Sequence, residues 1–395
     1  MSKPEGRSPE FIPFAAPTMG EDEVAAVTEV IRSGWLTTGP KAKEFERRFA
    51  EFVGGGEAIA VNSATAGLHL GLEALGIQPG DSVLTTPFTF TATAEVIRYL
   101  GADPVFADID PESLNIDPTE IERILGRRAV ASIIPVHYGG LACDMARICA
   151  LAKRHGCSVM TDAAHALPAT SGGRMVGGSD NDVAVFSFYA NKTITTGEGG
   201  MVVTRRPELA QRMRVMRLHG ISRDAFDRFH SRKPSWYYEV VAPGYKYNMP
   251  DLAAAIGLVQ LQKAEAFRQA RERIASRYRT GLADLPLRAP PGAPVGDVHS
   301  WHLYVVRLDL DRLSIDRDRF IELMSQAGIG TSVHYIPLHF HPYWRDRYKL
   351  RPEDYPCATR AYREVVSLPI YPGLTEAAVD RVIATVRSIL ESCAR

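Results

Sequence analysis

Lys192 could act in catalysis, because it is a lysine that lies between two predicted buried strands. It lies in the stretch FSFYANKTITTGEGGMVVT (186–204), between two runs that predict buried strands, and the nearest acidic residue along the chain is Glu198. A lysine held in a partly desolvated pocket loses its proton readily and can act as an amine nucleophile that forms a Schiff base. The competing interpretation is an ordinary surface lysine in a solvated loop.

The segment VNSATAGLHLGLEAL (61–75) predicts a strand, a tight polar turn and a helix. Asn62 or Ser63 is the expected N-cap of that helix. The positive end of the helix dipole would then form an anion site from the N–H groups of Ala64, Thr65 and Ala66. A phosphate would fit there, and a capped helix end without a ligand is the alternative.

A third polar group, Asp162, ends another predicted core strand in TDAAHA (161–166). A buried carboxylate is costly unless it meets a cation, and at the carboxyl end of a parallel strand that cation can belong to a ligand, such as a protonated pyridine ring. The alternatives are an N-cap role for Asp162 and a core position, bonded to backbone, for His165.

One cofactor requires all three features together. Pyridoxal phosphate (PLP) needs an anchor for its phosphate, a carboxylate that keeps its ring nitrogen protonated, and a lysine that joins its aldehyde. The coincidence of Lys192, Asp162 and the helix that begins near residue 64 therefore predicts a PLP site.

The elements that must position these groups alternate between strand and helix patterns from about residue 20 to residue 205. Such alternation predicts a mostly parallel sheet with helices on both faces and with ligands at the carboxyl ends of its strands. The predicted strands are 58–61, 82–86, 104–108, 131–136, 158–162, 183–188 and 201–204. The predicted helices between them are 68–75, 92–100, 118–125 and 145–156.

The chain is long enough for one large and one smaller unit. An amphipathic pattern after Pro250 predicts a long connecting helix, and residues 220–236 are expected to form an exposed loop. Shorter patterns follow the helix at 301–308 and 330–336, with helices from about 317 and at 375–392. The expected units are an N-terminal arm (1–20), a large PLP-binding domain (21–250), the connecting helix (251–280) and a small C-terminal α+β domain (281–395).

Composition argues against several classes of function. Lys plus Arg and Asp plus Glu each total 46, so no net charge attracts nucleic acid or an anionic membrane. The 5 cysteines include no CxxC pair, and no apolar run matches a signal peptide or a membrane span, so we expect a cytoplasmic protein. His334, His339 and His341 lack a nearby carboxylate or cysteine, so no metal is predicted.

The motifs around Lys192 and Asp162, with VNSATAGL and with PGYKYNMPDLAAAIGLVQL (243–261), resemble the DegT/StrS family of PLP-dependent nucleotide-sugar aminotransferases. The similarity runs from about GWLTTGP (34–40) to SLPIYP (367–372). PVHYGG and GYKYN are most similar to the branch that aminates 4-keto nucleotide sugars, including the enzyme that makes UDP-4-amino-4-deoxy-arabinose. The resemblance implies an α/β structure of the aspartate aminotransferase-like fold type I, with a seven-stranded, mostly parallel sheet between helices.

The resemblance also implies residue roles. Lys192 corresponds to the family's Schiff-base lysine, Asp162 to the carboxylate on the pyridine nitrogen, and His165 to a residue beside the ring oxygen, where many relatives have Gln. The other cofactor contacts implied within the chain are Ala64, Thr65 and Ser187 on the phosphate and Phe90 stacked on the ring.

Lys246 corresponds to a residue, usually Asn, that reaches the phosphate from the partner subunit, and Asn248 stands where Arg is common. The resemblance therefore implies a homodimer with two shared active sites. The candidate substrate contacts are His334, Trp35 and Thr37.

The implied reaction is a ping-pong transfer of the amino group of L-glutamate to a keto nucleotide sugar, a 4-keto-6-deoxy sugar or a 4-keto pentose. Its product would serve cell-surface polysaccharide, lipopolysaccharide or glycoside biosynthesis. The alternatives are a 3-keto sugar aminotransferase, a PLP-dependent sugar dehydratase and a PLP-binding regulator. Lys192 argues against the dehydratase, because that branch has histidine in place of the lysine.

Overall fold

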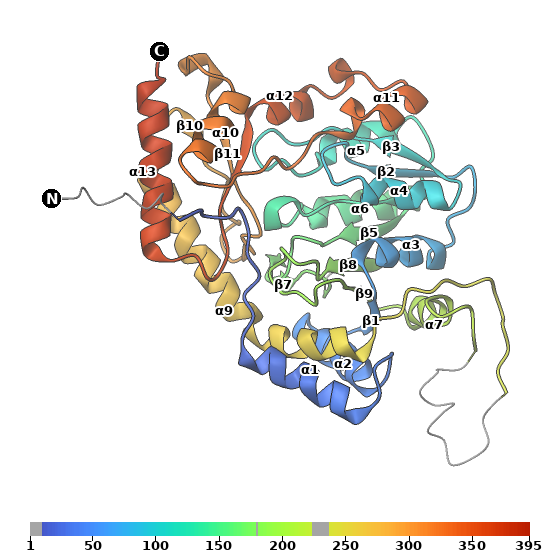
Figure 1. Ribbon diagram of the computed structural model, residues 1–395. Helices are drawn as coiled ribbons and strands as arrows, with labels where there is room; N and C mark the ends of the chain where they lie inside the picture. Colours follow the sequence, from blue (N-terminus) through green and yellow to red (C-terminus); the bar gives the residue numbers. More distant parts are fainter. Residues whose placement is uncertain (1–9, 179–180, 223–236) are drawn as a thin grey trace.

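The computed structural model describes residues 10–178, 181–222 and 237–395 (Figure 1). Within these residues, seven strands form one sheet in the order β1-β9-β8-β5-β4-β2-β3. Only β9 in that sheet runs antiparallel to its neighbours, so the sheet is mostly parallel, as the sequence predicts. The strands are β1 (Glu57–Val61), β2 (Ser82–Thr85), β3 (Asp103–Phe106), β4 (Ser132–Ile133), β5 (Ser158–Asp162), β8 (Val183–Ser187) and β9 (Gly200–Thr204).

Side chains alternate between the two faces of this sheet, and both faces are covered by helices. In β1, Ile59 and Val61 pack on one face, and Ala58 and Ala60 pack on the other. The first face is covered by α3 (Ala64–Ala74), α4 (Ala92–Tyr99) and α7 (Pro207–Met216). The opposite face is covered by α2 (Pro40–Phe52), α5 (Pro118–Leu125), α6 (Met145–His155) and the first half of α9 (Asp251–Gly281).

Two glycines one turn apart let α3 lie close to the sheet. A Cβ atom on Gly67 would lie 2.8 Å from Val185 Cγ1, and one on Gly71 would lie 2.6 Å from Met160 Sδ. Gly200 performs the same function at the end of β9, because its Cβ would lie 2.8 Å from the backbone N of Ala64. The N-terminus of α3 is thereby fixed beside the strand ends that carry Asp162 and Ser187.

The C-terminal part of the chain forms an antiparallel sheet in the order β10-β11-β12 among the described residues. Its core includes residues from the second half of α9 and from helices α10 and α13, and Ile12 of the N-terminal segment joins it through a bridge to Ile329. A two-stranded hairpin, β6 with β7, lies after β5. The remaining bounds are α1 (Glu21–Ser33), β6 (Thr170–Ser171), β7 (Arg174–Met175), β10 (Leu287–Arg288), β11 (Tyr304–Leu308), α10 (Arg317–Gln326), α11 (Pro342–Tyr348), α12 (Pro356–Glu364), β12 (Val365–Leu368) and α13 (Glu376–Ser392).

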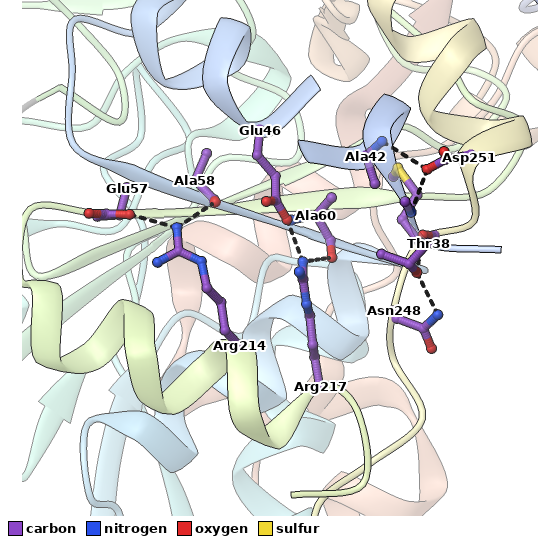
Figure 2. Close-up of polar contacts among 12 residues, drawn as sticks. Thr38, Ala42, Glu46, Glu57, Ala58, Ala60, Arg214, Arg217, Asn248 and Asp251 are labelled. Atoms are coloured by element: carbon purple, nitrogen blue, oxygen red, sulfur yellow. Dashed lines mark hydrogen bonds and ion pairs between the residues drawn. The ribbon is translucent and has the colours of Figure 1, made fainter. Parts of the chain in front are cut away.

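A polar network joins α2, β1, α7 and the start of α9 (Figure 2). Asp251 accepts hydrogen bonds from three backbone N–H groups at the N-terminus of α2. Glu46 pairs with Arg217, and Glu46 Oε1 also accepts a hydrogen bond of 2.9 Å from the backbone N of Ala60. The network sets the position of the turn before α2, which contains Trp35 and Thr37.

The predicted strands of the large sheet and the predicted helices correspond to observed elements, and α9 occupies the range predicted for the connecting helix. Residues 330–336 form no strand and pair only through a bridge between Ser332 and Ser367. Most of the expected loop at 220–236 lies outside the described residues, and the division into domains stays a prediction. No helix in the described part of the chain is long and apolar enough to cross a membrane.

Candidate active site

A cavity of about 480 Å³ lies at the carboxyl ends of β5 and β8 and beside the N-terminus of α3. Eight residues predicted from the sequence line it together: Ala64, Thr65, Phe90, Asp162, His165, Ser187, Lys192 and His334. A larger cavity of about 760 Å³ lies elsewhere, and the described residues that line it include several carboxylates but no lysine or histidine. The chemistry predicted from the sequence therefore belongs to the smaller cavity.

Lys192 lies in the turn that follows β8, where its backbone N donates to the Tyr189 carbonyl at 2.9 Å. Burial lowers the pKa of its ammonium group to about 8, while the nearby Asp162 carboxylate acts in the opposite direction. With this pKa, roughly a tenth of the Lys192 side chains are neutral amine at pH 7 and about half at pH 8, whereas a solvated lysine is almost fully protonated. The surface-lysine interpretation does not fit this environment.

Asp162 is the last residue of β5 and is only 6 % exposed. Its carboxylate accepts hydrogen bonds from Thr93 Oγ1 at 2.8 Å and from the backbone N of Ala164 at 3.1 Å. Burial raises its pKa, while these hydrogen bonds and Lys192 oppose the rise. Among the described residues it forms no ion pair, so its negative charge remains available to a cationic ligand.

The N-terminus of α3 faces the same cavity. Ser63, rather than Asn62, is the N-cap, and its Oγ accepts from the backbone N of Ala66 at 3.1 Å. The first N–H groups of a helix have no partner within the helix, so those of Ala64 and Thr65 remain for an anion in the cavity. Ser187, at the end of β8, adds a hydroxyl to this group.

Two histidines complete the inner wall. The His165 ring bonds the Gly139 backbone through Nδ1 and the Tyr335 hydroxyl through Nε2, and burial holds its pKa well below the usual range. The Nδ1 atom of His334 lies 2.8 Å from the hydroxyl of Ser367, and burial lowers the pKa of His334 to about 4. Both rings are therefore neutral at pH 7.

Four predicted residues do not line this cavity: Trp35, Thr37, Lys246 and Asn248. Lys246 Nζ donates to Asn248 Oδ1 at 2.7 Å, and Asn248 Nδ2 donates to Thr38 Oγ1 at the same distance (Figure 2 shows the Asn248 contact). Asn248 thus connects Lys246 to Thr38, the residue that follows Thr37.

The three histidines of the segment VHYIPLHFHPYW lie in different places in the structure. His334 faces the cavity, whereas His339 is buried against Tyr355 and bonds Thr359, and His341 lines a separate groove. No group of three or more His, Cys, Asp or Glu side chains in the described ranges could hold a metal ion.

Sequence reasoning missed several polar residues of the site, among them Thr93, Tyr335 and His302. Thr93 holds Asp162, and Tyr335 and His302 line the cavity. The sequence offers only a weak signal for them, because Thr93 lies inside a predicted helix, His302 lies inside a predicted strand pattern, and Tyr335 follows His334. Their contacts join segments that are far apart in the chain.

The site fits PLP. Its buried carboxylate interacts with Lys192 but forms no ion pair within the described residues, its helix N-terminus offers N–H groups, and its lysine is partly neutral. These three features converge on one cavity of about 480 Å³, as the cofactor requires.

Comparison with known proteins agrees with this geometry. Residues 17–387 match the DegT/DnrJ/EryC1/StrS aminotransferase family. The spore coat polysaccharide biosynthesis protein SpsC of Bacillus subtilis (strain 168) is 47 % identical over 96 % of this chain and 97 % of its own length.

Solved structures share the whole fold. Spr1654 from Streptococcus pneumoniae, in its PMP form, superposes with a TM-score of 0.90 at 32 % identity, covering 96 % of this chain and 99 % of that one. Its PLP form superposes with a TM-score of 0.89 at 32 % identity over 97 % of this chain and 99 % of that chain. PseC from Helicobacter pylori, an aminotransferase involved in the biosynthesis of pseudoaminic acid, gives a TM-score of 0.88 at 30 % identity, over 97 % of this chain and 100 % of that chain. The predicted fold type I architecture is confirmed, and the chain belongs to the DegT/DnrJ/EryC1/StrS aminotransferase family as a PLP-dependent enzyme.

Proposed function

We propose that this enzyme transfers the amino group of L-glutamate to a nucleotide-linked keto sugar, for the biosynthesis of a cell-surface polysaccharide or a related glycoside. The observation that carries the proposal is the convergence of Lys192, Asp162 and the N-terminus of α3 on one cavity. A PLP-binding regulator would need the phosphate site alone, and it would not need a partly neutral lysine beside a buried carboxylate.

When bound, PLP carries the amino group between the two substrates and delocalises into its ring the electrons of the C–H bond that breaks. Asp162 would hold the proton on the pyridine nitrogen, because the Thr93 hydroxyl and the Ala164 N–H keep its carboxylate in place. Ala64, Thr65 and Ser187 would hold the phosphate, and the exposed ring of Phe90 would stack on the cofactor.

Lys192 would act twice in each half of the reaction. As a neutral amine it would join the cofactor, and after release it would move the proton between the Cα atom of the amino donor and the cofactor carbon that receives it. A pKa of about 8 suits both steps, because the group gains and loses a proton near neutral pH. His334 would help to hold a substrate at the cavity wall.

The substrate class is supported by the named relatives. SpsC is named for spore coat polysaccharide biosynthesis, and PseC for the biosynthesis of pseudoaminic acid. The motifs PVHYGG and GYKYN favour amination at C4 of a 4-keto-6-deoxy sugar or a 4-keto pentose. A 3-keto sugar is the second candidate, and a dehydratase is disfavoured by Lys192.

We also propose a homodimer with shared sites. Lys246 is exposed and does not line the cavity of its own chain, which leaves it accessible to a partner subunit, and the resemblance assigns it to that subunit's cofactor phosphate. Trp35 and Thr37, which lie in the turn before α2, would reach the partner's sugar substrate.

A panel assay tests the proposal. Purified enzyme with PLP and L-glutamate is offered UDP-, dTDP- and GDP-linked 4-keto and 3-keto sugars, and formation of 2-oxoglutarate and amino sugar is measured. We expect one 4-keto sugar to be aminated, and Lys192→Ala to lose several orders of magnitude in rate while it still folds. Turnover by Lys192→Ala within about tenfold of the natural enzyme would contradict the catalytic assignment.

A further inference from the structure

The carboxylate of Asp162 is held at both of its oxygens. Its Oδ1 atom accepts from the backbone N of Ala164 at 3.1 Å, and its Oδ2 atom accepts from the Thr93 hydroxyl at 2.8 Å. The first bond is local, whereas the second comes from helix α4, 69 residues away in the chain. An ionised carboxylate has about four acceptor positions, so roughly two remain for a ligand in the cavity that Asp162 lines.

The Thr93 hydroxyl does not serve its own helix. A threonine near the start of a helix usually turns its hydroxyl to solvent or to a backbone carbonyl of the preceding turn. Thr93 is fully buried, and within the described residues its hydroxyl contacts two side chains, Asp162 and Thr89. The two threonine hydroxyls lie 3.0 Å apart, and Thr89 is also buried and lines the cavity.

These three side chains form a hydrogen-bond chain that has one direction when Asp162 is ionised. An ionised carboxylate can only accept, so the single hydroxyl proton of Thr93 goes to Asp162. The Thr93 oxygen then accepts the hydroxyl proton of Thr89. Because each bond in such a chain polarises the next, Thr89 strengthens the bond that Thr93 donates. The chain therefore favours the ionised form of Asp162, whereas burial raises the pKa of this carboxyl.

We propose that Thr93 is a positioning residue for the ring nitrogen of bound PLP, and that Thr89 supports Thr93. Thr93 acts through Asp162, because its hydroxyl fixes the direction of the carboxylate and keeps it ionised, and the carboxylate keeps the proton on the nitrogen. Phe90 lies between the two threonines in the chain, so the segment 89–93 carries groups for both the face and the nitrogen of the ring. The inference deepens the proposed function and rests on Asp162 facing that nitrogen.

¹⁵N NMR of the resting holoenzyme, loaded with PLP labelled at the ring nitrogen and free of substrates, tests the proposal. The chemical shift of that nitrogen reports whether it carries a proton. Thr93→Val keeps the shape of the side chain but removes the hydroxyl, so the carboxylate of Asp162 loses a hydrogen bond. The negative charge beside the ring is then less stable, and the pKa of the ring nitrogen should fall by about one to two pH units.

An analogue of PLP with a CH group in place of the ring nitrogen provides a second measurement. The analogue carries no charge at that position and gains nothing from an ionised Asp162. Thr93→Val should therefore weaken the binding of PLP to the cofactor-free protein about 10- to 100-fold more than it weakens the binding of the analogue. This comparison separates the effect on the nitrogen from any general loosening of the site.

Three further variants test the chain itself. Thr93→Ser keeps the hydroxyl and should titrate close to the natural enzyme. Thr89→Val should lower the pKa of the ring nitrogen by less than Thr93→Val does, because only the support of the Thr93 bond is lost. Thr85→Val is the matched control and should leave both measurements unchanged, because Thr85 is equally buried but its hydroxyl donates to the Ile134 carbonyl at 2.8 Å.

Two outcomes would overturn the proposal. In the first, Thr93→Val keeps the natural pKa of the ring nitrogen and the natural ratio of the two affinities. In the second, Thr85→Val changes both measurements as much as Thr93→Val, which would mean that any buried hydroxyl of this segment has the same effect. A natural enzyme whose bound PLP lacks the nitrogen proton would instead contradict the role of Asp162, and one that binds no PLP would contradict the proposed function.

Discussion

At the scale of single residues, the site depends on two buried groups of opposite charge, Lys192 and Asp162. Burial lowers the pKa of Lys192 and raises that of Asp162, and each charge partly reverses the shift of the other. Their balance is set by burial and by the groups that bond Asp162, which are the Ala164 backbone N–H and the Thr93 hydroxyl. A change at Asp162 should therefore change the protonation of Lys192 in the cofactor-free protein.

The lowered pKa of Lys192 predicts how cofactor capture depends on pH. Only the neutral amine attacks an aldehyde, so the rate of PLP capture by cofactor-free protein should rise about tenfold per pH unit below the pKa and level off above about pH 8. Stopped-flow absorbance measures this rate. A midpoint near the ordinary lysine pKa of about 10.4 would contradict the burial argument.

Asp162→Asn serves as a comparison for that titration. Asp162 raises the pKa of Lys192, so replacing its carboxylate by a neutral amide should move the midpoint below that of the natural protein. A midpoint that moves upward would mean that the two side chains do not interact as their charges require.

Residues whose roles follow from local pattern could be predicted from the sequence. Lys192, Asp162 and Ser63 each lie at a strand end or a helix start, and the sequence marks such ends. Tyr335 could not be predicted, because its hydrogen-bond partner in the site, His165, lies 170 residues away in the chain. Trp35, Thr37, Lys246 and Asn248 were placed by resemblance, and within one chain they do not join the cavity.

At the scale of elements, helix α2 depends on a cap that its own sequence does not supply. Gly39 is the N-cap and provides no side-chain acceptor. Asp251, at the start of α9, accepts instead from Gly39, Lys41 and Ala42, and is 2 % exposed (Figure 2). The start of α2 is thereby fixed by the start of α9, a contact that no local sequence pattern records.

Asp251→Ala should therefore be more damaging than the loss of an ordinary cap. It leaves three backbone donors at a buried helix end without their acceptor, so the free energy of unfolding should fall by about 2 to 4 kcal/mol. Asp144→Ala removes an exposed N-cap carboxylate that accepts from the single donor Arg147 N within the described residues, and should cost about 1 kcal/mol. Urea unfolding measures both, and equal losses would contradict the capping role of Asp251.

At the scale of the whole molecule, the alternation of strands and helices determined most of the architecture. The large sheet and its helices follow from patterns of period 2 and 3.6. The smaller C-terminal sheet was less predictable, because β10 is two residues long and β12 begins directly after α12. Its position depends on α9, whose second half packs in the core of the C-terminal part.

The exposed position of Lys246 leads to a prediction about assembly. Lys192→Ala damages the site on its own chain, where the lysine lines the cavity. If Lys246 reaches the partner's phosphate, Lys246→Glu damages the opposite site by placing a carboxylate against that phosphate. In a mixed dimer both lesions then fall in one site and the other site is intact.

Co-expression of these two inactive variants should restore activity, to roughly half of the natural level per mixed dimer if the sites act independently. Lys192→Ala mixed with Asp162→Asn is the negative control, because both side chains line the cavity of their own chain and each site of the mixed dimer keeps one lesion. Differently tagged subunits, purified in sequence, isolate the mixed dimers, and amino-sugar formation measures their activity. If mixed dimers form, Lys246→Glu is inactive alone and no activity returns, then Lys246 serves its own chain, and the shared-site arrangement is wrong while the PLP chemistry stands.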